Sequence, residues 1–328
     1  IMVYCLVPAC AEEGEAGFGP IPITNQNPLY VLFLHPVPDN TDTEGAGKID
    51  FDVRYTMANV NVREYSYPPA HDRDRIELDM EIHKLDLVFS YGLSDQMDLE
   101  LDIPFLFFWE GFLDSFVEAA EDAINAVSPN ARQDWGTNDY KYFVKYDNNV
   151  LVNRDENEGG LGDVVCSFKY RLIEEEGRLP SLALRTALKL PTGSESKLLG
   201  SGEVDYSLGI LAQKQYGRTC AYLNTDIVFI EKPDVFGTMP FDDHIVSAIL
   251  GMEYFLSEKT SLLFQAGATT SPFPSVDQVD VLKEAPIQAG FGASHKLGDS
   301  MVLQWGFIEN ITASWPDITL QTNLKWKF

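Results

Sequence analysis

Basic residues are scarce in this sequence. Its 328 residues hold 24 Lys and Arg against 50 Asp and Glu, which gives a formal net charge of −26 at pH 7. Nucleic-acid binders and proteins that dock on anionic lipid need clusters of Lys and Arg, so this composition excludes both classes. Disorder is excluded as well, because 45% of the residues are hydrophobic and 12% are aromatic.

Long apolar runs and cysteine motifs are also missing. No stretch approaches the roughly 18 apolar residues of a membrane-spanning helix. The four cysteines form no C-x-x-C pair, which excludes a c-type haem. The histidines are too scattered for a local metal site, and Gly200-Ser201-Gly202 lacks the spacing of a nucleophile elbow. We expect no catalytic residue, no metal, no cofactor and no enzymatic activity.

Strict alternation of apolar and polar residues marks the C-terminal stretch 316–328. A period of two is typical of a β-strand with one apolar and one polar face. The stretch ends on an aromatic pair, Trp326 and Phe328, with no polar tail after it. A terminal strand of this form closes bacterial outer-membrane barrels, and its last aromatic resembles the signal that the barrel-assembly machinery reads. We expect Trp326 and Phe328 to serve as that signal.

Similar alternation recurs along the chain and predicts about 12 strands of roughly ten residues, an even number as in single-chain bacterial barrels. Short turns at Gly177, Gly217, Glu258 and Gly298 follow one another at steps of about 40 residues, and longer connections alternate with them. The predicted fold is all-β: a transmembrane, antiparallel, up-and-down β-barrel. Two irregularities are expected, a bulge near His83-Lys84 and a loss of regular pairing at Pro104.

One long extracellular loop interrupts this rhythm. An apolar face over Phe112–Val127 predicts a helix in it, and residues 140–153 read as a weak hairpin. A 14-strand barrel that includes the hairpin is the alternative. Loop 110–160 is also where a protein partner would dock if the barrel were closed.

Charged residues fall on the inward parity of the strands. Acidic residues dominate the first three strands, and basic residues dominate the fourth, fifth and last. This arrangement favours either a charged pore with a transverse field or a salt-bridge network that fills the lumen. The expected lumen charges are Asp52, Arg54, Asp86, Asp98, Glu100, Asp102, Lys169, Arg171, Arg185, Lys189, Asp226, Glu253 and Lys325.

The N-terminal region divides into two parts before the barrel. Residues 1–11 read as a residual signal peptide with a cleavage site at Ala9-Cys10-Ala11, and lipidation of Cys10 is the rival interpretation. Residues 12–47 form a periplasmic segment or a lumen plug, because the apolar run Leu29–Leu34 is too short to span a bilayer and too apolar to stay in water. The barrel then covers residues 48–328.

Several motifs carry a family resemblance: the opening run from Gly19 to Leu29 with its Asn25-Gln26-Asn27-Pro28, then Tyr91–Asp95, Gly111–Phe116, Gly160–Asp163 and Leu190–Gly193. Together they resemble an uncharacterised family of Gram-negative outer-membrane β-barrels, related to barrels described as transporters or as phenol-degradation-pathway proteins. The resemblance implies the fold and an outer-membrane location, and it implies no substrate.

From the strands and the resemblance together we expect a channel or transporter for passive passage of a small solute through a narrow charged lumen. The alternative is a closed structural barrel that docks an extracellular or periplasmic partner through loop 110–160. The expected surroundings are outer-membrane lipid and lipopolysaccharide, the barrel-assembly machinery and an unidentified solute, with no nucleic acid.

Overall fold

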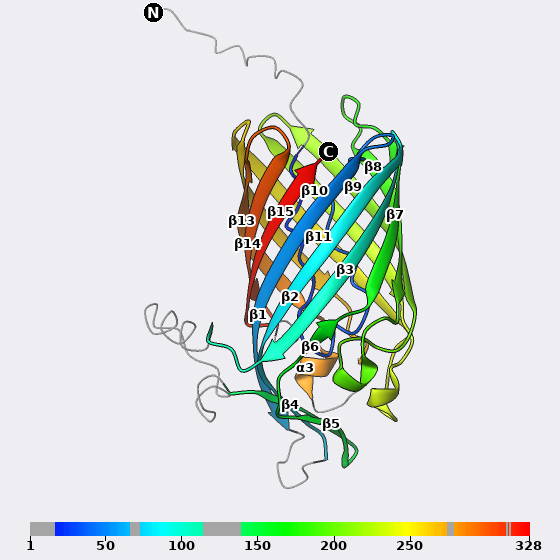
Figure 1. Cartoon of the computed structure of the whole chain (residues 1–328), viewed down its shortest axis with the longest axis vertical. Coiled ribbons are helices and arrows are strands. Elements are labelled where there is room, and N and C mark those ends of the chain that lie inside the picture. Colours follow the sequence, from blue (N-terminus) through cyan, green and yellow to red (C-terminus); the bar gives the residue numbers. More distant parts are fainter. Residues whose placement is uncertain (1–16, 66–72, 114–138, 274–278, 313, 315) are drawn as a thin grey trace, which may run out of the picture.

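Twelve antiparallel strands close into a barrel in the computed structural model, which describes residues 17–65, 73–113, 139–273, 279–312, 314 and 316–328 (Figure 1). Neighbours in sequence pair with each other, and β15 pairs with β1 to close the wall. The expected 12-strand up-and-down barrel is therefore confirmed. The strands of the wall are β1 (Ile49–Tyr65), β2 (Arg75–Ser94), β3 (Met97–Trp109), β7 (Val164–Ile173), β8 (Ser181–Leu190), β9 (Asp205–Tyr216), β10 (Thr219–Phe229), β11 (His244–Ser257), β12 (Thr260–Thr269), β13 (Ile287–Lys296), β14 (Met301–Asn310) and β15 (Ile318–Lys327).

Three further strands lie outside the closed wall. The hairpin of β4 (Lys141–Tyr146) and β5 (Asn149–Arg154) pairs with the first residues of β2, and β6 (Glu158–Leu161) pairs with the end of β3. The hairpin thus prolongs the β1–β2 ribbon beyond the barrel, so the 14-strand alternative is wrong.

Helical structure is minor in the described residues: α3 (Asp280–Lys283) and the single turns η2 (Glu195–Lys197) and η3 (Asp234–Phe236). Apart from its first two residues, the helix expected over Phe112–Val127 lies outside the described part of the chain. No helix among the described residues is both long enough and apolar enough to cross a membrane.

Short turns occupy one rim of the barrel and long connections the other (Figure 1). The turns between β9 and β10 and between β13 and β14 hold Gly217 and Gly298 at φ of 57° and 82°, a left-handed conformation that favours glycine. The C-terminus lies at the short-turn rim (Figure 1), and Gly17 lies beside Tyr222 and Glu253.

An apolar belt covers the outside of the barrel. Side chains of one parity are exposed on strand after strand, while their alternates point inward and are buried. This belt is what the wall of a membrane-spanning barrel requires. Large exposed members include Leu101, Leu184, Leu188, Leu208, Ile210, Leu223, Leu250, Met252, Phe264, Phe291 and Trp305.

The bulge expected near His83-Lys84 is absent, because β1 and β2 pair without a register shift from Ile49↔Tyr91 to Tyr65↔Arg75. The apolar residues that suggested it, Ile76, Leu78, Met80 and Ile82, point into the barrel and belong to its core. The expectation was wrong because it assumed that apolar side chains in β2 face lipid. At the long-loop end the interior is apolar instead.

Pro104 does end one of the pairings of β3. The ladder with β7 runs from Met97 to Asp102, and from Phe105 the same edge pairs with β6. Proline has no N–H to donate to a ladder, so the wall changes partner at this residue. On the other edge β3 stays paired with β2 through Trp109.

Candidate functional site

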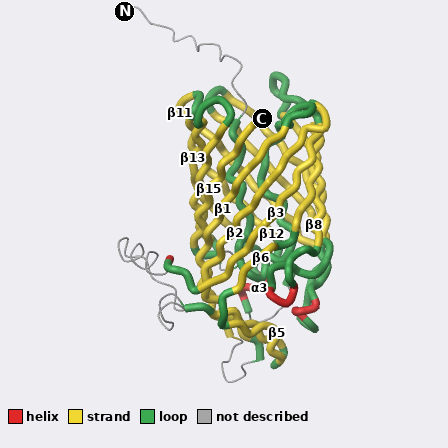
Figure 2. The backbone as a smooth tube through the Cα atoms, in the orientation of Figure 1, coloured by secondary structure: helices red, strands yellow, loops and turns green. Residues whose placement is uncertain are grey.

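The lumen is occupied by residues Gly17–Lys48, here called the luminal segment. This segment enters at the short-turn rim, runs to the opposite end, turns, and returns to β1 (Figures 1 and 2). Most of its side chains are buried. Its path can be followed by the hydrogen bonds that it makes with the inner wall.

The first limb is held at the short-turn rim by a buried carboxylate. Glu253 accepts hydrogen bonds from Tyr222 and Ser261 of the wall and from the Phe18 N–H, while the Gly19 N–H donates to the Tyr222 hydroxyl at 3.3 Å. Further along, the Ile21 N–H donates to Gln265 Oε1 at 3.0 Å. Backbone donors that water would otherwise satisfy are therefore paired inside the barrel.

The turn at the far end is built by the Asn25-Gln26-Asn27-Pro28 motif. Asn25 Oδ1 accepts from the Asn27 N–H at 2.9 Å, and Asn27 Oδ1 accepts from the Leu29 N–H at 3.0 Å. Such side-chain acceptors stabilise tight turns locally. Asn25 Nδ2 also donates to the Ser314 carbonyl at 3.1 Å, and the Pro28 carbonyl accepts from Tyr142 at 3.0 Å, so the turn is fixed to the long-loop rim.

An apolar cluster packs around that turn. Phe33 lies 5.6 Å from Phe241 and 6.2 Å from Phe273 between ring centroids, and Phe236 lies 5.1 Å from Phe273. The apolar run Leu29–Leu34 joins the same cluster as the inward residues of β2. Burial of these side chains is the main driving force for docking this end.

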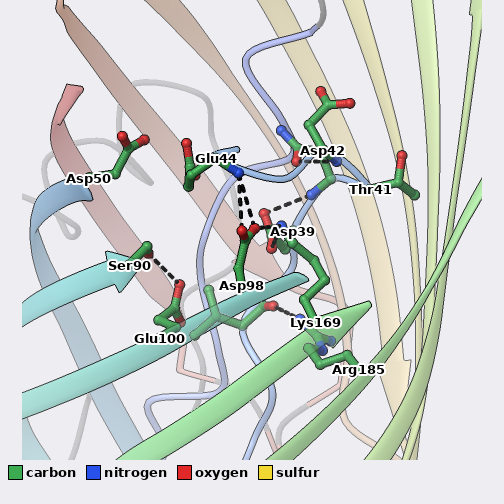
Figure 3. A network of polar contacts seen from close by, with 12 residues as sticks. Asp39, Thr41, Asp42, Glu44, Asp50, Ser90, Asp98, Glu100, Lys169 and Arg185 are labelled. Atoms are coloured by element: carbon green, nitrogen blue, oxygen red, sulfur yellow. Dashed lines mark hydrogen bonds and ion pairs between the residues drawn. The ribbon is translucent and has the colours of Figure 1, made fainter. Parts of the chain in front are cut away.

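The returning limb is held by polar contacts (Figure 3). Asp39 forms an ion pair with Lys169 at 2.8 Å, as Figure 3 shows. The Leu34 N–H donates to Asp205 at 2.8 Å, and Glu44 forms an ion pair with Lys325 at 3.0 Å. Burial alone would raise the pKa of Asp39, but the Lys169 ammonium outweighs it and lowers the pKa to about 2. The Asp39 carboxylate is therefore ionised at neutral pH.

Thr41 and the Glu44 backbone complete the return to the rim. Thr41 donates to Ser181 at 2.8 Å, and the Glu44 N–H is shared by both oxygens of Asp98 at 3.1 and 3.2 Å (Figure 3). The luminal segment is thus bonded to the wall along its whole length.

Opposite charges on the wall form further ion pairs between strands. Arg185 binds Asp226 at 2.8 Å, and Lys189 lies between Asp163 and Asp205 at 3.1 and 3.0 Å. Such buried pairs contribute little net stability, but removing one partner leaves an unpaired charge and costs about 3–5 kcal/mol. Their main effect is to fix the wall and the positions of its charges.

Most of the 13 expected lumen charges are buried and ion-paired. Asp52, Asp98, Arg185 and Lys189 are under 9% exposed. Arg171 differs: it lies at the short-turn rim, where its guanidinium donates to the Asp95 carbonyl at 2.8 Å. The remaining expected charges lie as follows: Arg54 with Asp52 and Glu100, Lys169 with Asp39 and Asp98, Asp226 with Arg185, Asp86 with Lys84, Lys325 with Glu44 and Asp50, Glu253 with Tyr222, and Asp102 in the cavity described next.

A cavity of about 140 Å³ lies between the luminal segment and one side of the wall. Its lining runs from Glu44, Asp98 and Lys325 at the short-turn rim to Leu106, Asp163 and Lys189 towards the other end. Seven acidic and six basic side chains line it, so its charge is nearly balanced: Asp39, Glu44, Asp52, Asp98, Glu100, Asp102 and Asp163 against Arg54, Lys84, Lys169, Arg185, Lys189 and Lys325.

Four of these charged lining residues were not among the expected lumen charges. Lys84 faces inward because the expected bulge does not occur, and Asp163 belongs to the Gly-Leu-Gly-Asp motif just before β7. Asp39 and Glu44 lie on the luminal segment, outside any alternating strand. The parity of β2 would have found Lys84, whereas no sequence signal connects Asp39 with Lys169.

Within the described ranges no cluster of three or more His, Cys, Asp or Glu is arranged to hold a metal ion. Cys166 is exposed on the outer face and Cys220 is buried, and neither forms a disulfide in the described part of the chain.

Fold and lumen together define a closed 12-stranded β-barrel of the outer-membrane type, occupied by its own N-terminal segment. The chain belongs to the family described as "Protein of unknown function (DUF3187)", which matches residues 1–328. No curated protein has significant sequence similarity to it.

One solved outer-membrane channel shares the fold, and two porins match more weakly. The COG4313 outer membrane channel from Pseudomonas putida F1 matches with a TM-score of 0.57 at 17% identity, over 89% of this chain and 99% of that one. The NanC porin matches with a TM-score of 0.46 at 8% identity, over 85% and 100%. The KdgM porin matches with a TM-score of 0.43 at 8% identity, over 85% and 99%. These neighbours are porin-like channels rather than enzymes.

Proposed function

We propose that this protein is an outer-membrane channel through which a small polar solute diffuses passively. The observation that carries the proposal is the charged cavity, whose lining extends from the short-turn rim towards the long-loop end of the barrel. The exposed apolar belt supports a position in lipid, with lipopolysaccharide beside the long loops. The channel function of the structural neighbours agrees with it.

Selectivity would come from the nearly balanced charge of the cavity. A lining with acidic and basic side chains in similar number repels neither sign of ion strongly, and it favours solutes that exchange hydrogen bonds with both. The luminal segment narrows the passage, so the proposed channel passes small solutes and excludes large ones. No bond-making step is required, which fits the proposal that the protein is not an enzyme.

Conductance in a planar bilayer tests the proposal. The full chain should give small, discrete current steps, and an uptake assay in proteoliposomes should show a sharp size limit. A barrel that inserts and folds but gives no current and no uptake above empty membranes would contradict the proposal. That result would favour the closed structural barrel with a partner at loop 110–160.

A further inference from the structure

Arg54 reaches across the inner wall in the middle of the cavity. Its Nη2 donates to Asp52 on the same strand at 3.2 Å and lies 3.7 Å from Glu100 on β3. Because β2 lies between β1 and β3, the guanidinium extends over one whole strand. Asp102 is the next inward-facing residue after Glu100 on β3, so its carboxylate lies on the same stretch of wall (Figure 3 shows Glu100 and its partner Ser90).

Several polar atoms here have no hydrogen-bond partner among the described residues. They are Nε and Nη1 of Arg54, Oδ1 of Asp52 and Oδ1 of Asp102. Arg54 and Asp102 are only 7% and 6% exposed, and both line the cavity. In the part of the chain that the structure describes, Asp102 makes no ion pair, not even with Arg54. A buried donor or acceptor without a partner is costly, so such atoms are rare unless something else binds them.

The luminal segment leaves these atoms without a partner. Where it lines the cavity it brings Pro20, Pro22, Pro36 and Pro38, which have no backbone N–H to donate to Asp52 or Asp102, and Val37. The same segment also brings polar side chains to the lining, among them His35, Asp39 and Asn40. A solute with a compact charged end and a short apolar end can pair with the wall and pack against the prolines.

We propose that Arg54 and Asp102 form a binding site for a small zwitterion of the α-amino acid class with a short aliphatic side chain, such as alanine. This inference rests on the proposed channel function and names the class of its solute. The ligand carboxylate accepts from the free N–H groups of Arg54, and its ammonium donates to Asp102 and Asp52. The side chain lies against the prolines of the luminal segment.

Charge compensation distinguishes this class from other small solutes. A simple anion would satisfy Arg54 but approach Asp52, Glu100 and Asp102, and a simple cation would leave the free edge of Arg54 unpaired. A neutral polyol would compensate neither charge. Only a ligand that carries both charges a short distance apart bridges Arg54 and Asp102, which are too far apart to pair directly. The cavity, at about 140 Å³, is comparable with cavities that hold a benzene-sized molecule.

Binding to the purified full chain in detergent micelles tests the site without any transport. Alanine should bind at least about tenfold more tightly than lactate, which lacks the ammonium, and than alaninol, which lacks the carboxylate, because each loses one charge-assisted hydrogen bond. Asp102→Asn should abolish the preference over lactate. Asp299→Asn, in the exposed turn before β14, is the matched control and should keep it. Because the three ligands are compared on the unmodified protein, the test does not depend on how a variant folds.

Uptake by proteoliposomes separates this inference from the proposed function. If the barrel passes ions but binds and admits alanine no better than lactate and alaninol, the site is refuted and the channel stands. If it binds alanine with the stated preference but passes neither alanine nor ions, the site is supported and the channel function fails. The proposed site is also refuted if the Asp102→Asn variant binds alanine as tightly as the unmodified protein does.

Discussion

Deleting Phe18–Thr43 should widen the pore. The deletion removes both limbs of the luminal segment and the contacts of Ile21 with Gln265, of Asp39 with Lys169 and of Thr41 with Ser181. It leaves the strands of the wall and their register intact, since β1 begins at Ile49. The wall charges released by the deletion face water, which solvates them.

Barrel geometry sets the size of the effect. Strands about 4.8 Å apart and tilted by about 40° give a 12-strand barrel a radius of about 12 Å. Inward side chains of about 5 Å leave an opening of about 150 Å², of which two extended limbs fill about 100 Å². Removing them raises the free cross-section about threefold, and at constant length the conductance rises in proportion.

Single-channel current in a planar bilayer measures the change, with a cross-linked variant as the opposite control. The cross-linked variant carries Thr41→Cys and Ser181→Cys, which replace two hydroxyls 2.8 Å apart, a separation from which a disulfide can form. Cys166 and Cys220 are replaced by serine in the same protein, so that they cannot form competing disulfides. The deletion should conduct about three times as well as the full chain, and the oxidised cross-link no better than it. A folded deletion variant with unchanged conductance would show that the segment does not limit the pore.

Three smaller predictions follow from particular residues. Burial, helped by Lys84 and Lys189, lowers the pKa of His35 from 6.5 to about 4, so the undocked segment binds the proton more readily than the docked one. Docking of the segment should therefore weaken as the pH falls from 6.5 to 4, and the single-channel conductance should become noisier. His35→Gln should lack this response. Phe328→Ala should reduce the amount of folded barrel recovered from the outer membrane of a bacterial host, measured by heat-modifiable migration, and equal recovery would argue against an assembly signal. Leu208→Arg, on the exposed belt, should destabilise the barrel in lipid by about 2–4 kcal/mol in a urea titration, whereas no change would place Leu208 outside the bilayer.

The wall could be predicted from sequence because alternation is a local property. Strands such as β8 and β9 bury every second residue, and their turns carry glycine, so the strand count and the order of pairing follow from a period of two. Alternation separates two faces but does not say which one meets lipid. In β2 the apolar face of Ile76–Ile82 packs on the luminal segment, and the assumption that apolar means outward produced the bulge that the structure lacks.

The luminal contacts could not be predicted for a different reason. Asp39 and Lys169 are separated by 130 residues, and Ile21 and Gln265 by 244, so their pairing depends on the closed barrel and on the path of the segment within it. The sequence offered only a negative argument, namely that Leu29–Leu34 is too apolar to remain in water. The turn at Asn25-Gln26-Asn27-Pro28 could be predicted from the sequence, because two Asn residues before a proline are typical of a turn. Its position at the far end of the lumen could not be predicted.

The luminal segment explains why a pore of this size can be both filled and charged. A 12-strand barrel is too wide for its own side chains to fill, and an open lumen would leave the wall charges in bulk water. The segment divides the interior: it is bonded to the wall on both sides, and between it and the strands β1–β3, β7, β8, β14 and β15 it leaves the cavity. Charges facing that cavity act at short range on whatever enters, because the segment narrows the space opposite them and little water screens them. Selectivity of the proposed channel therefore depends on the segment as much as on the wall, and a variant without it should lose discrimination between alanine and lactate together with its low conductance.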